Sequence, residues 1–186
     1  MGRNSVDKVR AGGAGPRGIL ICGVIAAGGE NLGRAKAGMS EVWGPIGRES
    51  AILPFDYTTY YEEEMGGGLV RQFLAFAKVI GQESLPEFKH QAMALEAELG
   101  DESSGRLRRR ANIDPGYLSL ERLVLATTKN FIHRVYLRDG IFADLTLVFR
   151  SETFVPLEWT YPDYRTPQAI EFFNQVREEF KVDLRG

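Results

Sequence analysis

The chain has 186 residues, 44% of them hydrophobic and 26% charged, which is the composition of an ordinary globular protein of about one domain. Its 23 Lys and Arg against 25 Asp and Glu give a formal net charge of -2, which argues against a general nucleic-acid binder. One cysteine, Cys22, excludes an intrachain disulfide and a cysteine-based zinc site. With no apolar run near the ~18 residues of a membrane span, we expect a cytoplasmic protein without a membrane partner.

The first third of the chain begins with a polar, glycine-rich stretch. Residues 1–17 predict a flexible arm. The apolar run at 18–27 predicts a buried strand that contains Cys22. Apolar residues at helical spacing over 30–43, followed by Gly44-Pro45, predict a helix with a sharp end.

Two further strands are predicted at 49–55 and 69–80, on either side of a tyrosine- and acid-rich loop at 56–68. Ser84 with Pro86 just inside predicts a helix that runs to Leu99. A polar loop then leads into a short strand at 111–113.

These elements follow the order β-α-β-β-α-β, which is the ferredoxin-like, or split βαβ, arrangement. We therefore expect an α+β fold in which residues 18–118 form the ferredoxin-like unit. Residues 119–186 are expected to add a C-terminal helix, β-hairpin and helix extension to it. The whole of 18–186 is expected to fold as a single domain.

The extension is predicted to begin and end with helices. Ser119 is expected to cap a short helix that runs to Thr127. Thr166 as N-cap and Pro167 at the first helical position predict the last helix. The apolar face of this last helix consists of Ile170, Phe173, Val176 and Phe180.

Between these helices, Asp139-Gly140 separates two β-rich runs at 130–137 and 141–150. Asp-Gly predicts a two-residue hairpin turn, because both central positions of that turn need positive φ. Counting outward from the turn pairs Arg138 with Ile141 and Val135 with Asp144.

The same register makes His133 and Asp144 diagonal neighbours on one face, with Arg134 on the opposite face. A histidine beside a carboxylate can act as a general base, so His133 and Asp144 are the candidate catalytic residues. The alternative is a half-buried histidine that stabilises the sheet.

Three segments share tyrosines and an acid: Phe55–Gly66, Asn112–Leu118 and Trp159–Arg165. The two later segments add rigid turns, predicted at Asp114-Pro-Gly and Tyr161-Pro-Asp. Together the three segments resemble the domain of unknown function 4416 family, which consists of small prokaryotic proteins. The resemblance extends from Gly18 to Phe180. It implies kinship without a mechanism, although some relatives carry a GTP-binding label.

Tyrosine combines a flat apolar face with a polar tip, and binding residues tend to lie on loops held by a rigid scaffold. We predict a site for a small molecule, such as a nucleotide or another phosphorylated metabolite. Its candidate residues are Asp56, Tyr57, Tyr60, Tyr61, Asp114, Tyr117, Lys129, Tyr161, Asp163, Tyr164 and Arg165. The same tyrosines and acids equally fit a structural network without a pocket.

The nucleotide and metal motifs are incomplete. Gly28–Ala35 has the glycine spacing of a phosphate-binding loop but lacks its lysine and its hydroxyl, so we predict a simple strand-to-helix turn. Magnesium remains an alternative at Asp56, Glu62 and Glu64, without a full motif to support it.

Three functions therefore stay open. The leading hypothesis is a small-molecule-binding protein. The second is a hydrolase or phosphoryl-transfer enzyme that uses His133 and Asp144 or a divalent cation. The third is an interaction module without a pocket. The ligand and the oligomeric state stay open as well.

Overall fold

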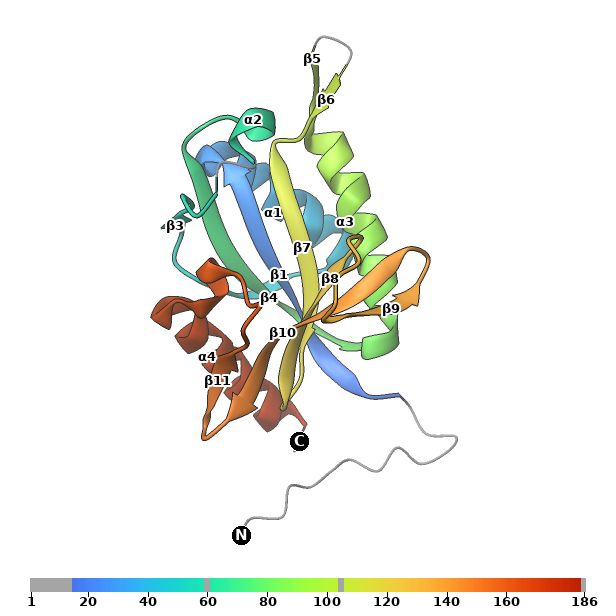
Figure 1. Cartoon of the computed structure of the whole chain (residues 1–186), viewed down its shortest axis with the longest axis vertical. Helices are drawn as coiled ribbons and strands as arrows, with labels where there is room; N and C mark the ends of the chain where they lie inside the picture. Colours follow the sequence, from blue (N-terminus) through green and yellow to red (C-terminus); the bar gives the residue numbers. More distant parts are fainter. Residues whose placement is uncertain (1–14, 59–60, 104–105, 185–186) are drawn as a thin grey trace.

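The computed structural model describes residues 15–58, 61–103 and 106–184, and it is an α+β structure built on one large antiparallel sheet (Figure 1). The strands of this sheet are β1 (Arg17–Ala27), β2 (Ile46–Glu49), β3 (Leu53–Pro54), β4 (Leu69–Gly81), β7 (Ala111–Leu118), β8 (Arg122–Thr127), β9 (Arg134–Arg138), β10 (Ile141–Arg150) and β11 (Thr153–Pro156). A separate hairpin pairs β5 (Asp101–Ser103) with β6 (Arg106–Arg108). The helices are α1 (Gly28–Trp43), α2 (Glu62–Met65), α3 (Leu85–Leu99) and α4 (Pro167–Asp183), with 3-10 turns η1 (Gln82–Ser84) and η2 (Pro162–Arg165).

All strand pairings in the main sheet are antiparallel, and the order across it is β11-β10-β8-β7-β1-β4-β2. β3 adds to β4, and β9 adds to β10. The predicted strands at 18–27 and 69–80 are confirmed in β1 and β4. The predicted helices at 30–43 and 84–99 are confirmed in α1 and α3.

Helices α1 and α3 cover one face of the sheet, and α4 covers one end of the other face (Figure 1). Side chains alternate between these faces along β1. Leu20, Cys22 and Val24 pack toward α1 and α3, whereas Ile19 and Ile21 pack toward α4. Cys22 is buried, as predicted, and β1 reads as a nearly continuous apolar run because both of its faces are covered.

The predicted helix at 119–127 is wrong, because residues 122–127 form β8. Ser119 closes the turn before it: its N–H donates to the Arg122 carbonyl at 2.9 Å, and its hydroxyl accepts from Glu121 N at 3.3 Å. Val124 packs toward α1 and α3, while Leu125 packs toward the other face. A short apolar run suits either a strand or a helix by periodicity alone, and burial on both faces favours the strand.

Three predicted strands have the wrong extent. The β-rich run at 130–137 becomes a strand only from Arg134, as β9. The one at 49–55 is divided, because β2 ends at Glu49 and only Leu53–Pro54 returns to β4. Between them the Ser50 hydroxyl accepts a hydrogen bond from Phe73 N at 2.9 Å. This side-chain contact takes the place of a backbone hydrogen bond with β4. The strand at 111–113 continues to Leu118, so the expected turn at Asp114-Pro-Gly lies inside β7.

The hairpin turn at Asp139-Gly140 is confirmed, with φ of 53° and 76°. The predicted register is correct only for the first pair, Arg138 with Ile141. An irregularity after that pair places Arg134, and not Val135, opposite Asp144. A shift of one residue moves every later side chain to the other face, so the predicted position of Arg134 is wrong.

The final helix agrees with its predicted start. The Thr166 hydroxyl accepts from Ala169 N at 3.2 Å, and Pro167 follows as the first helical residue. Phe173, Val176 and Phe180 of the predicted apolar face are buried against the sheet. None of the helices in the described ranges is both long and apolar enough to cross a membrane.

Candidate ligand-binding cavity

A cavity of about 660 Å³ lies where the sheet divides. β8 pairs only with the end of β7, at Gly116–Leu118, whereas β10 stays paired with β8 as far as Thr127. β8, β9 and β10 therefore diverge from the first half of β7 (Figure 1). The cavity occupies this division and is lined from β4, β7, α3 and η2 as well as from β8, β9 and β10.

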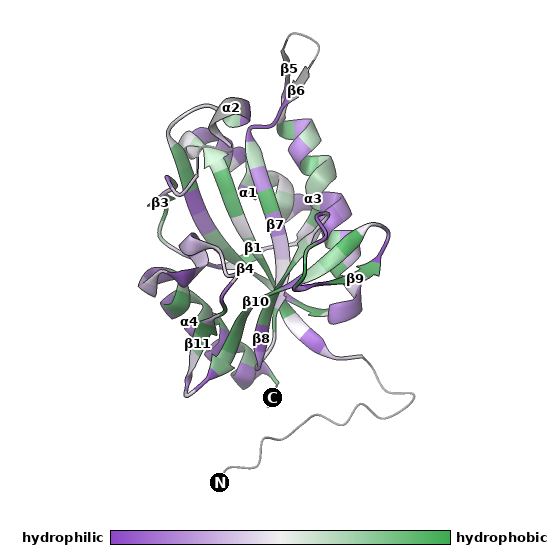
Figure 2. Cartoon of the chain, viewed as in Figure 1, coloured by the Kyte–Doolittle hydropathy of each residue, from purple (hydrophilic) through white to green (hydrophobic). Residues whose placement is uncertain are grey.

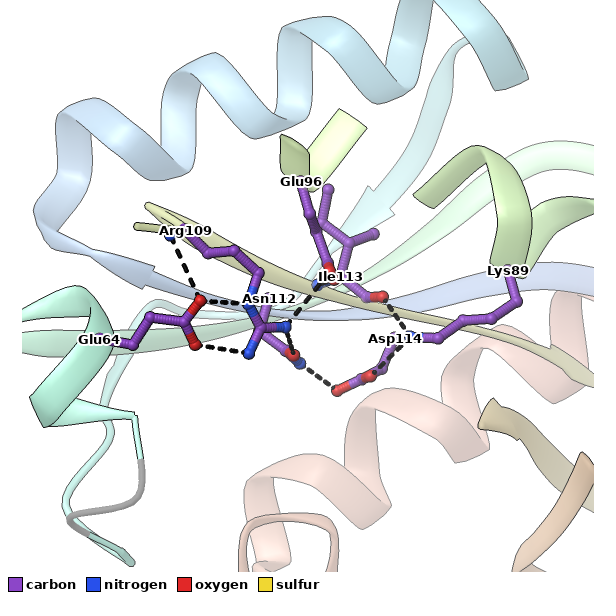
Figure 3. A network of polar contacts seen from close by, with 7 residues as sticks. All are labelled: Glu64, Lys89, Glu96, Arg109, Asn112, Ile113 and Asp114. Carbon is purple, nitrogen blue, oxygen red and sulfur yellow. Dashed lines mark hydrogen bonds and ion pairs between the residues drawn. The ribbon is translucent and has the colours of Figure 1, made fainter. Parts of the chain in front are cut away.

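The first half of β7 lacks a neighbouring strand on this side, and α3 supplies its hydrogen-bond partners (Figure 3). Ile113 N–H donates to Glu96 Oε1 at 2.6 Å, and Lys89 Nζ donates to the Ile113 carbonyl at 3.1 Å. Pro115, two residues later, has no N–H to leave unpaired, which explains a proline inside a strand. At Gly116, a Cβ would lie 2.5 Å from a carbonyl oxygen of β8, so glycine permits the strands to meet there.

Hydrophilic positions interrupt the apolar runs of β4 and β7 (Figure 2). In β7 these include Asn112 and Asp114, which line the cavity. Asn112 Nδ2 donates to Asp114 Oδ2 at 2.6 Å, and Lys89 Nζ lies 3.3 Å from Asp114 Oδ1 (Figure 3). Both oxygens of this carboxylate are thus held by neighbours.

Arg109 joins the short helix α2 to the same wall. Its guanidinium donates two hydrogen bonds to Glu64, of 2.8 Å from Nε and 2.7 Å from Nη2, and its backbone N–H donates a third at 3.4 Å (Figure 3). Its Nη1 donates to Glu96 at 3.3 Å and to Asn112 at 3.2 Å. Burial raises the pKa of Glu96, and the nearby charge of Lys89 only partly offsets this effect. The folded protein therefore favours the protonated, neutral form of Glu96 more than the unfolded chain does.

Arg71 of β4 lies at the cavity floor with a side chain only 5% exposed. Its Nη2 lies 2.5 Å from Asp163 Oδ2, in an ion pair without hydrogen-bond alignment. The guanidinium carbon is 5.4 Å from each of the ring centres of Phe55, Phe73 and Tyr164. Burial lowers the pKa of Arg71, but the charge of Asp163 and other neighbours outweighs it, so the pKa is raised and the group stays charged.

Gly23 of β1 makes room for this arrangement. A Cβ at position 23 would lie 2.2 Å from the Tyr164 hydroxyl and 2.7 Å from Arg71 Nη1. Any other residue would displace one of the two side chains from the sheet surface. The glycine therefore has a packing role in the middle of a buried strand.

The cavity brings together residues from all three tyrosine- and acid-rich segments. The predicted residues that line it are Tyr57, Tyr61, Asp114, Lys129, Tyr161, Asp163 and Tyr164, and Asp144 lines it as well. Tyr57 and Tyr161 are 46% and 54% exposed, so their rings are accessible from solvent. Tyr60 lies outside the described residues.

Three predicted ligand-binding residues lie elsewhere. Tyr117 is three positions after Asp114 in the same strand and so points to the opposite face, where it is buried under α1 and α3. Arg165 donates to the carbonyls of Thr160 and Leu157, both at 2.7 Å, and fixes the turn before α4. Asp56 is exposed and does not line the cavity.

The candidate catalytic pair is close, but in a different setting from the predicted one. His133 Nε2 lies 3.5 Å from Asp144 Oδ2, while Arg134 Nε donates to the same oxygen at 2.8 Å. The His133 ring stacks on Trp159, at 4.8 Å and 10° between the planes. His133 precedes β9 and does not line the cavity, whereas Asp144 does.

The metal and phosphate-loop motifs have structural explanations. Glu64 is bound by Arg109, Asp56 is exposed, and the Glu62 side chain lies outside what the structure describes. Within the described residues, no three His, Cys, Asp or Glu side chains gather closely enough for a metal ion. α1 starts at Gly28, directly after β1, so the predicted strand-to-helix turn at 28–35 is already helix.

The prediction missed the charged residues that organise the cavity, namely Arg71, Lys89, Glu96 and Arg109. The sequence offers one indication for Arg71. It alternates with the apolar residues Leu69 and Phe73 along β4, so its side chain is expected on the same buried face of the strand. Lys89 and Glu96 are charged residues of a helix with no sequence feature that marks them as buried, and only the free edge of β7 explains their burial.

Fold and site together define an α+β protein with a cavity lined by tyrosines and charged residues in a divided antiparallel sheet. The family model described as Domain of unknown function (DUF4416) matches residues 16–180, and the chain belongs to this family. Neither the curated proteins nor the solved structures gave a match.

Proposed function

We propose that this protein binds a small molecule, a nucleotide or another phosphorylated metabolite, in the cavity between β7 and β8. One observation carries the proposal: the three segments of shared composition, far apart in sequence, line the same cavity. Tyr57 comes from the first segment, Asp114 from the second and Tyr161 from the third.

The lining chemistry supports this class of ligand. The exposed rings of Tyr57 and Tyr161 offer flat surfaces for a planar group. The walls hold the cations Lys89, Lys129, Arg109 and Arg134 beside the acids Glu96, Asp114 and Asp144, and such cations form strong charge-assisted hydrogen bonds with phosphate. The proposal includes the cytoplasmic location expected from the sequence.

A thermal-shift screen of nucleotides, sugar phosphates and non-phosphorylated analogues, with and without magnesium, tests the proposal. We expect at least one phosphorylated compound to raise the melting temperature, because a ligand that binds only the folded state stabilises it. Tyr161→Ala should weaken its binding about tenfold by calorimetry, the loss of one stacking contact.

Tyr136→Ala is the matched control, because Tyr136 is 59% exposed on β9 and does not line the cavity. It should bind as the wild type does. The proposal is wrong if no compound stabilises the protein, or if both tyrosine variants lose affinity equally.

A hydrolase or phosphoryl-transfer enzyme is the second candidate. It is favoured by one contact: Asp144 lines the cavity and lies 3.5 Å from His133. This candidate requires the bound compound to be turned over, and turnover to collapse in His133→Gln while the fold persists.

The interaction module is the third candidate, and it would use another surface. Val135, Tyr136 and Leu137 of β9 are exposed, as are Phe131 and Ile132 before it. None of these five residues belongs to the three segments, so this candidate leaves their convergence unexplained.

We also propose that residues 18–118 form a ferredoxin-like unit. The strand order β7-β1-β4-β2, antiparallel throughout and with α1 and α3 on one face, supports this arrangement. β8, β9, β10 and β11 then extend the sheet beyond β7.

A further inference from the structure

Two side chains at the cavity floor carry hydrogen-bond donors without an acceptor in the described part of the chain. These atoms are Nε and Nη1 of Arg71 and the hydroxyl of Tyr164. The Arg71 side chain is 5% exposed, Tyr164 is 1% exposed, and both line the cavity. Buried polar groups are nearly always hydrogen-bonded, so these donors require an explanation.

Two of the three atoms converge on one point. Arg71 Nη1 and the Tyr164 hydroxyl both lie within 3 Å of where a Cβ of residue 23 would stand, at 2.7 and 2.2 Å. Because residue 23 is glycine, these two donors can lie directly over β1 and close to each other. Asp114 is the cross-strand neighbour of Gly23, which places this point beside the polar wall of β7.

The nearby carboxylates face cations or amides, although Asp163 Oδ2, like the two donors, makes no aligned hydrogen bond. Asp163 pairs with Nη2 of Arg71 at 2.5 Å, and Asp114 is held by Asn112 at 2.6 Å and Lys89 at 3.3 Å. The other side of the guanidinium faces aromatic rings, where the local dielectric is low and attraction for an anion is stronger than in water.

We infer that the floor of the cavity is an oxyanion subsite, in which Arg71 Nη1 and the Tyr164 hydroxyl donate to a carboxylate or phosphate oxygen of the ligand. The inference rests on the proposed function and adds the orientation of the ligand to it. The anionic end enters first and meets these two donors at the cavity floor, and the remainder extends toward Tyr57 and Tyr161.

Tyr164→Phe tests the subsite, because it removes a hydroxyl that has no partner and keeps the ring packed on Phe73 and Phe173. The probes are inorganic phosphate, pyrophosphate and acetate, titrated by calorimetry and thermal shift against sodium chloride of equal ionic strength. We expect the unliganded melting temperature to persist and the anion affinity to fall about tenfold or more, the loss of one hydrogen bond to a charged group. Tyr117→Phe, buried on the other face of the sheet, is the control and should bind as the wild type does.

Gly23→Ala is the second variant, because its Cβ would overlap both donors and displace at least one of them, and it should abolish anion binding. The stronger of the phosphate and acetate responses identifies the anion. The subsite is refuted if Tyr164→Phe binds these anions like the wild type, or if only uncharged compounds from the screen bind. That result leaves the cavity function intact, whereas wild-type protein that binds nothing at all refutes both.

Discussion

His133 shows how the surroundings of one residue decide between chemistry and packing. Its side chain is 8% exposed, its ring stacks on Trp159, and its Nδ1 is buried without a partner. Asp144, the carboxylate that would orient it, accepts a shorter contact from Arg134, at 2.8 against 3.5 Å. These contacts favour a residue that stabilises the loop before β9.

We therefore expect His133→Gln to lower the free energy of unfolding by about 1–3 kcal/mol, because ring stacking is lost and a buried polar group changes partners. Urea denaturation measures this loss. Ligand affinity should be unchanged, since His133 does not line the cavity. His90→Gln is the control, because His90 is an exposed residue of α3. An unchanged unfolding curve together with lost turnover would instead establish the enzyme hypothesis.

Among single residues, the sequence predicted those whose type alone suggests a role better than those whose role depends on a distant partner. Tyr57 and Tyr161 were predicted from their type and setting, and both line the cavity. Arg71 was missed because its partner Asp163 lies in a distant segment, and no local pattern connects them.

Among the elements, β7 and α3 depend on each other most directly. The strand lacks a neighbour at Ile113, and the helix supplies a carboxylate and an ammonium group in its place. Glu96 is only 5% exposed in this position. The hydrogen bonding of β7 therefore depends on a buried carboxyl group whose protonation changes with pH.

The stability of the fold should therefore depend on pH through Glu96. Burial raises its folded pKa above the usual 4.5, so folding favours the protonated acid. That contribution is fully present below pH 4.5 and is lost as the pH rises through the raised pKa, by about 1.4 kcal/mol for each unit of pKa difference. Glu96→Gln keeps an oxygen for Ile113 N–H but does not titrate.

Urea denaturation from about pH 4 to about pH 8 is the measurement, and we expect the stability of wild type relative to Glu96→Gln to decrease across this range. Glu98→Gln, an exposed change on the same helix, controls for the loss of one charge. A difference that stays constant or grows with pH would contradict the raised pKa.

Elements with their own end signals were predicted from the sequence, and elements defined by neighbours were not. Thr166-Pro167 and Asp139-Gly140 each determine the backbone locally, and both predictions are confirmed. β8 has only a short apolar run, and its strand character comes from burial on both faces. The irregularity beside Ile141 is likewise invisible in the alternation that predicted the register.

For the whole molecule, the position of the cavity follows from unequal coverage of the sheet. α1 and α3 cover one face, while α4 covers only one end of the other. The remaining end is left to the loop before α2, to η2 and to the diverging strands, which carry the tyrosines and acids. The proposed binding residues lie at this end because a rigid scaffold there holds loops that need not form a core.

This arrangement separates the cavity from the glycine pattern at 28–35, which lies in α1. Gly33→Asp tests that separation, because a Cβ at Gly33 would meet no atom within 4 Å and the helix should tolerate the change. We expect its affinity for any phosphorylated ligand of the wild type to stay within about twofold, as for a surface substitution, while Tyr161→Ala loses affinity. Calorimetry with GTP and magnesium is the critical measurement, because the missing lysine and hydroxyl remove the charge and the metal ligand of a phosphate loop. Tight, magnesium-dependent GTP binding that Gly33→Asp abolishes would move the nucleotide site from the cavity to the start of α1.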